Sequence, residues 1–217
     1  MKKIALLYSG CGHKDGAEIT ETVSVLTNLY LAGVKVNCFS LNMEIPVTNH
    51  LTGLTSKTET RNMLAEAARI SRGQIQDLNS LVVSDFDALV IAGGLGAALH
   101  FSTWAEKGME CTVEPEVKRV ITEFFAQQKP IGAVCIAPIL LAKCLAGKGI
   151  TITLGPQSDK FDVLKRWDVE VVECPVDDFI TDRDHKIITT PAFMHDADFG
   201  QVFVGIKGMI QELVEMA

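Results

Sequence analysis

The sequence lacks several features that would assign it to a broad class at once. No apolar run approaches the ~20 residues that a membrane-spanning helix requires. No cluster of lysine or arginine appears, and 27 acidic residues outnumber 20 basic ones. Nucleic acid and anionic membrane are therefore not expected as partners. The apolar part of the N-terminus, from Ile4 to Tyr8, is too short for a secretory signal, so we expect a cytoplasmic protein.

Cysteine is present but not in a pattern that indicates disulfides or metal. None of the six cysteines forms a C-x-x-C pair, and Cys11-Gly12-His13 has no companions at the spacing of zinc ligands. We expect no disulfide framework, no metal and no organic cofactor. With 217 residues, of which 47% are hydrophobic, the chain fits one globular domain over residues 1–217.

Short β-type runs alternate with helical patterns along most of the chain. This alternation predicts a mainly parallel sheet with helices on both faces. In the first helix, Val23, Leu26, Leu29 and Tyr30 recur at helical spacing. The predicted strands are 3–9, 34–41, 88–92, 130–134, 150–154 and 169–173, with a hairpin over 178–181 and 186–190; the predicted helices are 17–32, 57–69, 114–127, 138–145 and 198–216.

One region does not follow the alternation clearly. Residues 42–56 read as a long polar loop that precedes the helix predicted over 57–69. We therefore interpret Asn42 to Arg72 as an insertion or a partner-contact region.

The most informative stretch runs from Pro130 to Pro138. An apolar strand ends abruptly at Cys135, and a helix pattern follows at once. This is the order of a nucleophile elbow, in which a helix N-terminus lowers a thiol pKa and offers backbone N–H groups to an oxyanion. The alternative is that Cys135 is a small buried hydrophobic residue.

The other strand exits supply candidate partners for the thiol. Glu18 follows the first strand, where it is either part of a capping box that begins at Asp15 or an acid facing Cys135. The glycines Gly93 and Gly94 match neither a P-loop nor a dinucleotide fingerprint, and we interpret them as a tight turn close to a ligand. The N–H groups of Gly94 and Ile136 would then form an oxyanion hole.

No histidine follows Cys135 directly. His13 and His195 are the nearest candidates for the pocket, together with Gly12 and Gly93, although each histidine also fits an ordinary loop position.

Taken together, these residues resemble the ThiJ/PfpI superfamily, the cysteine branch of the class I glutamine-amidotransferase-like fold. Within it the chain is similar to the ElbB family, also called isoprenoid biosynthesis proteins with an amidotransferase-like domain. The resemblance runs nearly end to end and rests on these blocks: Ser9-Gly10-Cys11-Gly12, Asn49-His50-Leu51-Thr52-Gly53, Thr58-Glu59-Thr60-Arg61-Asn62, Glu110-Cys111-Thr112-Val113, Cys135-Ile136-Ala137-Pro138, Cys174-Pro175-Val176-Asp177-Asp178 and Thr189-Thr190-Pro191-Ala192.

The resemblance implies a flavodoxin-like αβα sandwich with the nucleophile at Cys135 and its partner acid at Glu18. It also implies oxyanion donors at Gly94 and Ile136, a homodimer, and glyoxalase activity without glutathione. The chain departs from the glutaminase and peptidase branches, because it has no late His-x-Glu and has Ile136 where peptidase-like members have histidine.

We therefore expect a cofactor-free glyoxalase that converts glyoxal to glycolate through a hemithioacetal on Cys135, with Glu18 as general acid and base. Glu18 then needs a pKa raised by burial. The alternative function is an oxidation sensor or protein-binding module, in which the thiol reacts without turnover.

Overall fold

A seven-stranded sheet forms the centre of the molecule, with strands in the order β10-β11-β7-β6-β1-β2-β5. The structure is a computed structural model that describes the backbone of residues 1–217 and all side chains except those of residues 159 and 160. Neighbouring strands are parallel except for β10 and β11. The strands are β1 (Lys3–Leu7), β2 (Lys35–Ser40), β5 (Ile75–Asp77), β6 (Ala88–Ile91), β7 (Ile131–Val134), β10 (Ile180–Asp182) and β11 (Ile187–Thr190).

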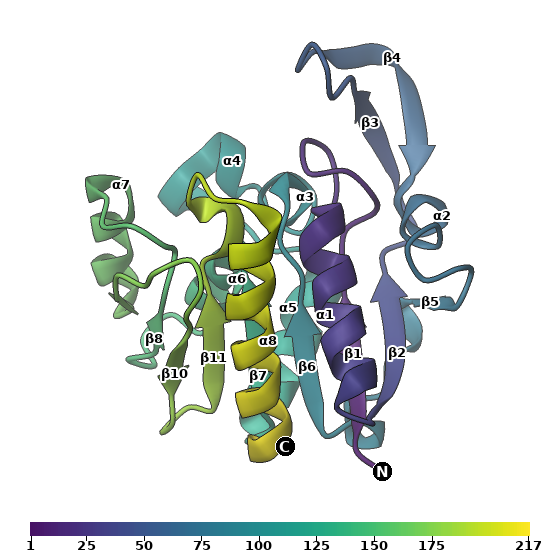
Figure 1. Ribbon diagram of the computed structural model, residues 1–217. Coiled ribbons are helices and arrows are strands. Elements are labelled where there is room, and N and C mark those ends of the chain that lie inside the picture. Colours follow the sequence, from purple (N-terminus) through teal and green to yellow (C-terminus); the bar gives the residue numbers. More distant parts are fainter.

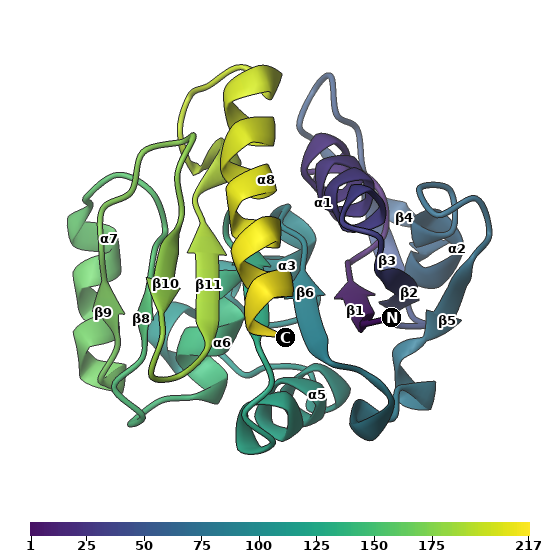
Figure 2. The same cartoon turned by 60° about the horizontal axis from the view of Figure 1, so that its bottom comes forward.

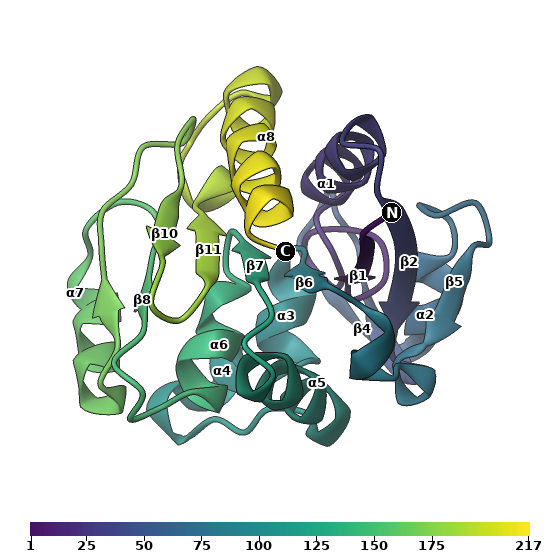
Figure 3. The ribbon, with the colours of Figure 1, turned by 90° about the horizontal axis from the view of Figure 1, so that it is seen from below.

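Helices cover both faces of this sheet. α1 (Ile19–Leu31) and α8 (Phe199–Met216) lie side by side on one face, and α3 (Leu95–Leu99), α5 (Pro115–Ala126) and α6 (Pro138–Cys144) lie on the other (Figures 1 and 3). The shorter helices are α2 (Met63–Ala67), α4 (Trp104–Lys107), α7 (Asp159–Asp162), and the 3-10 turns η1 (Leu78–Ser80), η2 (Val83–Asp85), η3 (Gly108–Glu110), η4 (Val163–Trp167) and η5 (Ala192–Met194).

The covered sheet explains the continuous apolar runs in the sequence. Every residue of β6, β7 and β11 is buried, as expected for strands that have a helical layer on each face. The predicted flavodoxin-like αβα architecture is confirmed. Among the described residues, no helix is both long and apolar enough to span a bilayer.

The region from Asn42 to Arg72 differs from its prediction. The predicted polar loop and helix are instead an antiparallel hairpin of β3 (Glu44–Thr48) and β4 (Thr55–Asn62), which projects from the body of the molecule (Figure 1). We call residues 44–62 the arm. The helix α2 begins only at Met63, because the side chain of Asn62 accepts a hydrogen bond from the N–H of Ala65 and caps it.

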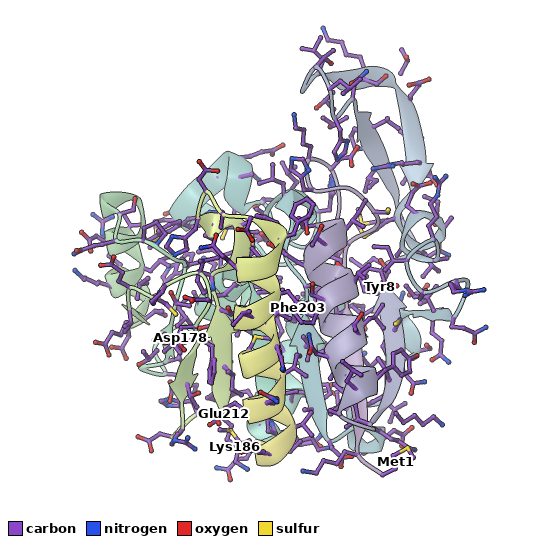
Figure 4. The ribbon with its side chains drawn as sticks, in the orientation of Figure 1. Met1, Tyr8, Asp178, Lys186, Phe203 and Glu212 are labelled. Atoms are coloured by element: carbon purple, nitrogen blue, oxygen red, sulfur yellow. The ribbon has the colours of Figure 1, made fainter. Side chains whose placement is uncertain are left out.

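Of two further predictions, one needs adjustment and the other is confirmed. The strands predicted near residues 150 and 170 exist as β8 (Thr151–Ile152) and β9 (Glu170–Val171), but they pair with each other outside the central sheet. The predicted hairpin of β10 and β11 is confirmed. Arg183 in its turn pairs with Glu212 of α8 at 2.8 Å, and Figure 4 marks Glu212 and Lys186 at that end of the molecule.

The order of the strands locates a binding crevice. The chain runs from β1 to β2 on one side and returns to β6 on the other side of β1. Ligands of such sheets bind at this reversal, outside the carboxyl ends of the strands. Both chain termini lie at the opposite end of the sheet (Figures 1 and 2).

Candidate active site

The candidate residues follow three neighbouring strands and lie at the same end of the sheet. Glu18 follows β1, Gly93 and Gly94 follow β6, and Cys135 follows β7. Because β7, β6 and β1 are adjacent and parallel, their carboxyl ends bring these residues together at the reversal of strand order.

Cys135 has the backbone geometry of a nucleophile elbow. Its φ is +62°, a left-handed conformation that side-chain-bearing residues rarely adopt, and its N–H donates to the carbonyl of Thr190 at 2.9 Å. The helix α6 begins three residues later, at Pro138. The strained turn directs the side chain out of the strand, as in G-x-S-x-G hydrolases. Although it is 92% buried, Cys135 lines a cavity rather than only the core.

The N–H groups of Gly94 and Ile136, which the sequence analysis expected to form an oxyanion hole, both approach the sulfur of Cys135. Each lowers the pKa of the thiol through a backbone hydrogen bond. Neither N–H donates to a backbone carbonyl of the described residues outside the regular elements. This pair of donors can therefore hold negative charge on the sulfur or on an oxygen attached beside it.

The carboxyl group beside the thiol belongs to Glu21, which the sequence analysis did not single out. Glu21 lies in the first turn of α1 and is fully buried. Its Oε1 accepts the N–H of Phe193 at 3.3 Å, while Oε2 has no nitrogen or oxygen donor among the described residues. The Cys135 thiol interacts with it directly.

Gly93 makes this approach of acid and thiol possible. A Cβ atom at residue 93 would collide with Oε2 of Glu21 and with Cβ of Cys135. Gly93 therefore packs against the side chains of Glu21 and Cys135 and does not line the cavity. Only glycine fits between these two side chains.

Burial and proximity change the ionisation of both groups. Burial, followed by the charge of Glu18, raises the pKa of Glu21 to about 8. Burial, followed by the negative charge of Glu21, raises the pKa of the Cys135 thiol well above its usual value, against the opposing effect of the two N–H donors. At neutral pH the pair is therefore mostly protonated on both groups.

Of the two positions expected for Glu18 from the sequence, the structure contradicts the capping box and agrees with an acid near Cys135. Glu18 is the N-cap of α1, with Oε2 accepting the N–H of Glu21 at 2.6 Å, so the capping box that begins at Asp15 is wrong. Its side chain also lines the cavity that contains Cys135. Burial raises its pKa, in the direction expected, although backbone N–H groups of the first turn oppose the shift.

The cavity over Cys135 has a volume of about 630 Å³. Of the predicted pocket residues, His13 lines it, whereas Gly12, Gly93 and His195 do not. His195 instead contacts the carbonyl of Cys174 at 2.8 Å, and Gly12 packs against His50. The lining residues are His13, Glu18, Gly94, Leu95, Cys135, Ile136, Phe161, Phe193, Met194 and Phe199.

Asp15 anchors the loop that carries His13 and Glu18. It pairs with Arg61 of the arm and accepts the N–H of Thr48 at 2.5 Å. Arg61 also pairs with Glu66 at 2.9 Å and donates to the carbonyl of Cys11 at 3.0 Å. The base of the arm and the active-site loop thus share one network of charges. Among the described residues no group of His, Cys, Asp and Glu side chains has the arrangement of a metal site.

Two mitochondrial relatives are similar to this chain over nearly its whole length. It is 38% identical over 229 residues to human "Glutamine amidotransferase-like class 1 domain-containing protein 3, mitochondrial", covering 99% of this chain and 83% of the human protein. It is 37% identical over 224 residues to the rat "ES1 protein homolog, mitochondrial", covering 99% of this chain and 84% of the rat protein.

Solved structures with the same fold are also similar to this chain. The crystal structure of an isoprenoid biosynthesis protein with amidotransferase-like domain from Ehrlichia chaffeensis superposes with a TM-score of 0.92 at 33% identity, covering 100% of this chain and 99% of that one. Drosophila melanogaster DJ-1beta shares the fold, with a TM-score of 0.56 at 20% identity over 99% of this chain and 96% of its own. The family model "DJ-1/PfpI family" matches residues 2–204, and the chain therefore belongs to the DJ-1/PfpI family.

Proposed function

We propose that this protein is a cysteine-dependent glyoxalase that needs no cofactor and converts small 2-oxoaldehydes to 2-hydroxy acids, with glyoxal giving glycolate. The observation that carries the proposal is the environment of Cys135: a buried carboxyl and two backbone N–H donors converge on one thiol at the wall of a cavity. Such a site can activate a thiol and hold an alkoxide without a histidine.

The first step is addition of sulfur to the aldehyde. The ionised form of Glu21 takes the thiol proton while sulfur bonds to the aldehyde carbon, and the N–H groups of Gly94 and Ile136 hold the developing alkoxide. Proton return to that oxygen completes the hemithioacetal. A base with a pKa of about 8 is well matched to this task near neutral pH.

The second step moves hydrogen within the bound substrate. Glu18 removes the proton from the carbon that bears sulfur, giving an enediol, and returns a proton to the neighbouring carbon, which leaves a thioester on Cys135. Water then releases glycolate and restores the thiol. Overall, glyoxal and one water give glycolic acid, so no oxidant or reductant is consumed. The cap bond of Glu18 uses Oε2, which leaves Oε1 for this transfer.

Three finer assignments accompany this proposal. The similarity to the Ehrlichia isoprenoid biosynthesis protein favours the ElbB branch of the family. We also propose the homodimer that this branch implies. We keep the cytoplasmic location as a proposal. The human and rat relatives carry "mitochondrial" in their names, which does not clearly fit it.

The alternative of an oxidation sensor has less support from the geometry. Oxidation requires an accessible thiolate. Burial and Glu21 instead keep the Cys135 thiol protonated at neutral pH. A thiol in this state suits addition assisted by a base more than direct reaction with peroxide.

The test is glycolate formation from glyoxal without glutathione, followed by initial rates. We expect many turnovers per subunit in the wild type, and a loss of at least 100-fold in Cys135→Ala, because the covalent intermediate cannot form. Glu21→Gln and Glu18→Gln should each lose roughly 100-fold, the usual size of a general acid–base contribution. The wild-type rate should rise with pH up to about pH 8, as Glu21 ionises.

Cys144→Ala is the matched control, because it removes a partly buried thiol of α6 that does not line the cavity. It should retain wild-type turnover. Less than one turnover per subunit in the wild type, or full activity in Cys135→Ala, would exclude the proposed function and favour the sensor or binding role.

A further inference from the structure

We infer that the cavity selects uncharged 2-oxoaldehydes that carry a bulky apolar substituent, such as an aryl group, over glyoxal itself. This inference rests on the proposed function, because it assumes that the aldehyde reacts at Cys135. It adds the class of substrate, which follows from the size, lining and charge of the cavity.

The cavity is far larger than glyoxal requires. Its volume of about 630 Å³ falls within the range of sites for drug-sized ligands. Glyoxal has four non-hydrogen atoms, and a single water in the liquid takes about 30 Å³. A substrate of that size would leave most of the cavity to solvent and gain little binding energy from its walls.

The two ends of the cavity differ in exposure. Cys135 and Ile136 are 8% and 9% exposed, whereas Leu95 and Phe199 are 45% and 67% exposed. The aldehyde must reach the buried end, where the sulfur and the N–H donors are. Any substituent on the second carbonyl then extends toward the exposed end.

That exposed end is apolar and aromatic. Phe199, at the start of α8, is exposed and Phe193 of η5 is partly buried, and the centroids of their rings lie 5.6 Å apart in an edge-to-face arrangement. Phe161 of α7 also lines the cavity but is buried. Covering these rings with an apolar substituent removes water from both partners, at about 25 cal/mol per Å² of apolar surface. An aryl group also matches the edge-to-face geometry already present.

The charges around the cavity exclude anionic substituents. No lysine or arginine lines it among the described residues. Its titratable side chains besides Cys135 are Glu18 and His13, and burial, followed by the charge of His50, lowers the pKa of His13. A carboxylate or phosphate on the substrate would therefore meet an acidic group and no cation, which is costly in a partly desolvated site.

The first test compares substrates by kcat/KM in initial-rate assays. We expect phenylglyoxal to exceed glyoxal by at least tenfold. We also expect 4-methylphenylglyoxal to exceed 4-carboxyphenylglyoxal by at least tenfold, because the two have similar size and differ in charge. A preference for glyoxal, or equal values for the charged and uncharged pair, would overturn the inference while leaving the proposed chemistry intact.

Variants of α8 test the aromatic wall. Phe199→Ala should reduce the ratio of phenylglyoxal to glyoxal by at least fivefold, and Phe199→Leu should restore part of it. Val204→Ala is the matched control, since Val204 is 52% exposed on the same helix and does not line the cavity. It should leave the ratio unchanged. An equal ratio in wild type and Phe199→Ala would show that the aromatic wall does not set specificity.

A measurement that needs no turnover separates the two proposals. Cys135 is alkylated with iodoacetamide and with N-benzyliodoacetamide, and its modification is followed by peptide mass spectrometry. Each rate is divided by the rate at which the same reagent alkylates glutathione, which corrects for the reactivity of the reagent itself. We expect the benzyl reagent to react at least tenfold faster after this correction, with saturation. This result without any glyoxalase turnover would reject the proposed function and retain the apolar selectivity, whereas equal corrected rates would reject the selectivity.

Discussion

At the scale of single residues, the candidate active site contains a carboxyl group that folding removes from water. Glu21 is fully buried beside Cys135, and burial raises its pKa to about 8, from 4.5 in water. A carboxylate without a cation is costly in such a position, so the group holds its proton over much of the physiological range. The raised pKa on which the proposed role of Glu21 as a base depends also makes Glu21 a cost to stability at high pH.

The pH dependence of stability should reveal this group. Between pH 4.5 and pH 8 the folded protein keeps the Glu21 proton while the unfolded chain releases it. Rising pH therefore favours unfolding, and the contribution of the protonated group, complete below pH 4.5, is lost as pH passes 8. We expect the wild type to lose up to about 1.4 kcal/mol per pH unit relative to Glu21→Gln in this window. Urea unfolding at several pH values measures the difference.

Glu59→Gln supplies the control for that experiment. Glu59 is an exposed residue of β4, so its replacement should leave the wild-type slope unchanged. Equal slopes in wild type and Glu21→Gln would show that the buried carboxyl does not hold its proton in the folded state.

The sequence analysis singled out Cys135 and the two N–H groups that lie beside its thiol, but not this acid. Cys135, Gly94 and Ile136 were predictable because each stands at an abrupt strand exit. The predicted apolar stripe of α1 included Val23 and Tyr30, which are 45% and 62% exposed. The buried face instead carries Glu21, Val25, Asn28 and Leu29. Glu21 stands four residues before Val25, a helical spacing that could have placed it on that face.

At the scale of elements, the base of the arm is fixed by buried charge. Arg61 of β4 lies between Asp15 and Glu66, which are 2% and 7% exposed. The side chain of Arg61 is itself only 22% exposed. Asp15 belongs to the loop that precedes Glu18, so the arm and the active-site loop are held by one cation.

Removal of that cation should be strongly destabilising. Arg61→Ala leaves the carboxylate of Asp15 buried without a cation, whereas Glu66 keeps its ion pair with Arg69, and we expect a loss of about 3–5 kcal/mol in the free energy of unfolding. Arg183→Ala is the comparison, because Arg183 pairs with Glu212 but is 75% exposed. It should cost less than about 1 kcal/mol. Similar losses for the two variants in urea unfolding would contradict a special role for the arm network.

The arm also shows where pattern-based prediction reached its limit. Residues 57–62 contain Lys57, Glu59 and Arg61, which favour a helix, yet they alternate with threonine and form a strand. Pairing with β3 decides the conformation, and a single sequence does not display that pairing. The strands of the central sheet were predictable because burial on both faces makes them continuously apolar.

At the scale of the whole molecule, the cavity and the arm both lie at the carboxyl end of the parallel sheet. The carboxyl ends of β1, β6 and β7 form the cavity, while the arm extends beyond them, away from the body (Figure 1). A two-stranded hairpin is only marginally stable alone in water. The exposed apolar residues Leu51 and Leu54 at the tip of the arm, 97% and 72% exposed, make it the natural surface for the expected homodimer.

We therefore expect the wild type to sediment at about twice the 23.6 kDa of one chain. The double variant Leu51→Asp with Leu54→Asp should sediment as a monomer with unchanged circular dichroism, because charge at the tip prevents burial there without touching the core. Leu31→Asp is the matched control: Leu31 is 75% exposed at the C-terminal end of α1 and should leave the dimer intact. A monomeric wild type would refute the homodimer, and a dimeric double variant would place the interface away from the arm.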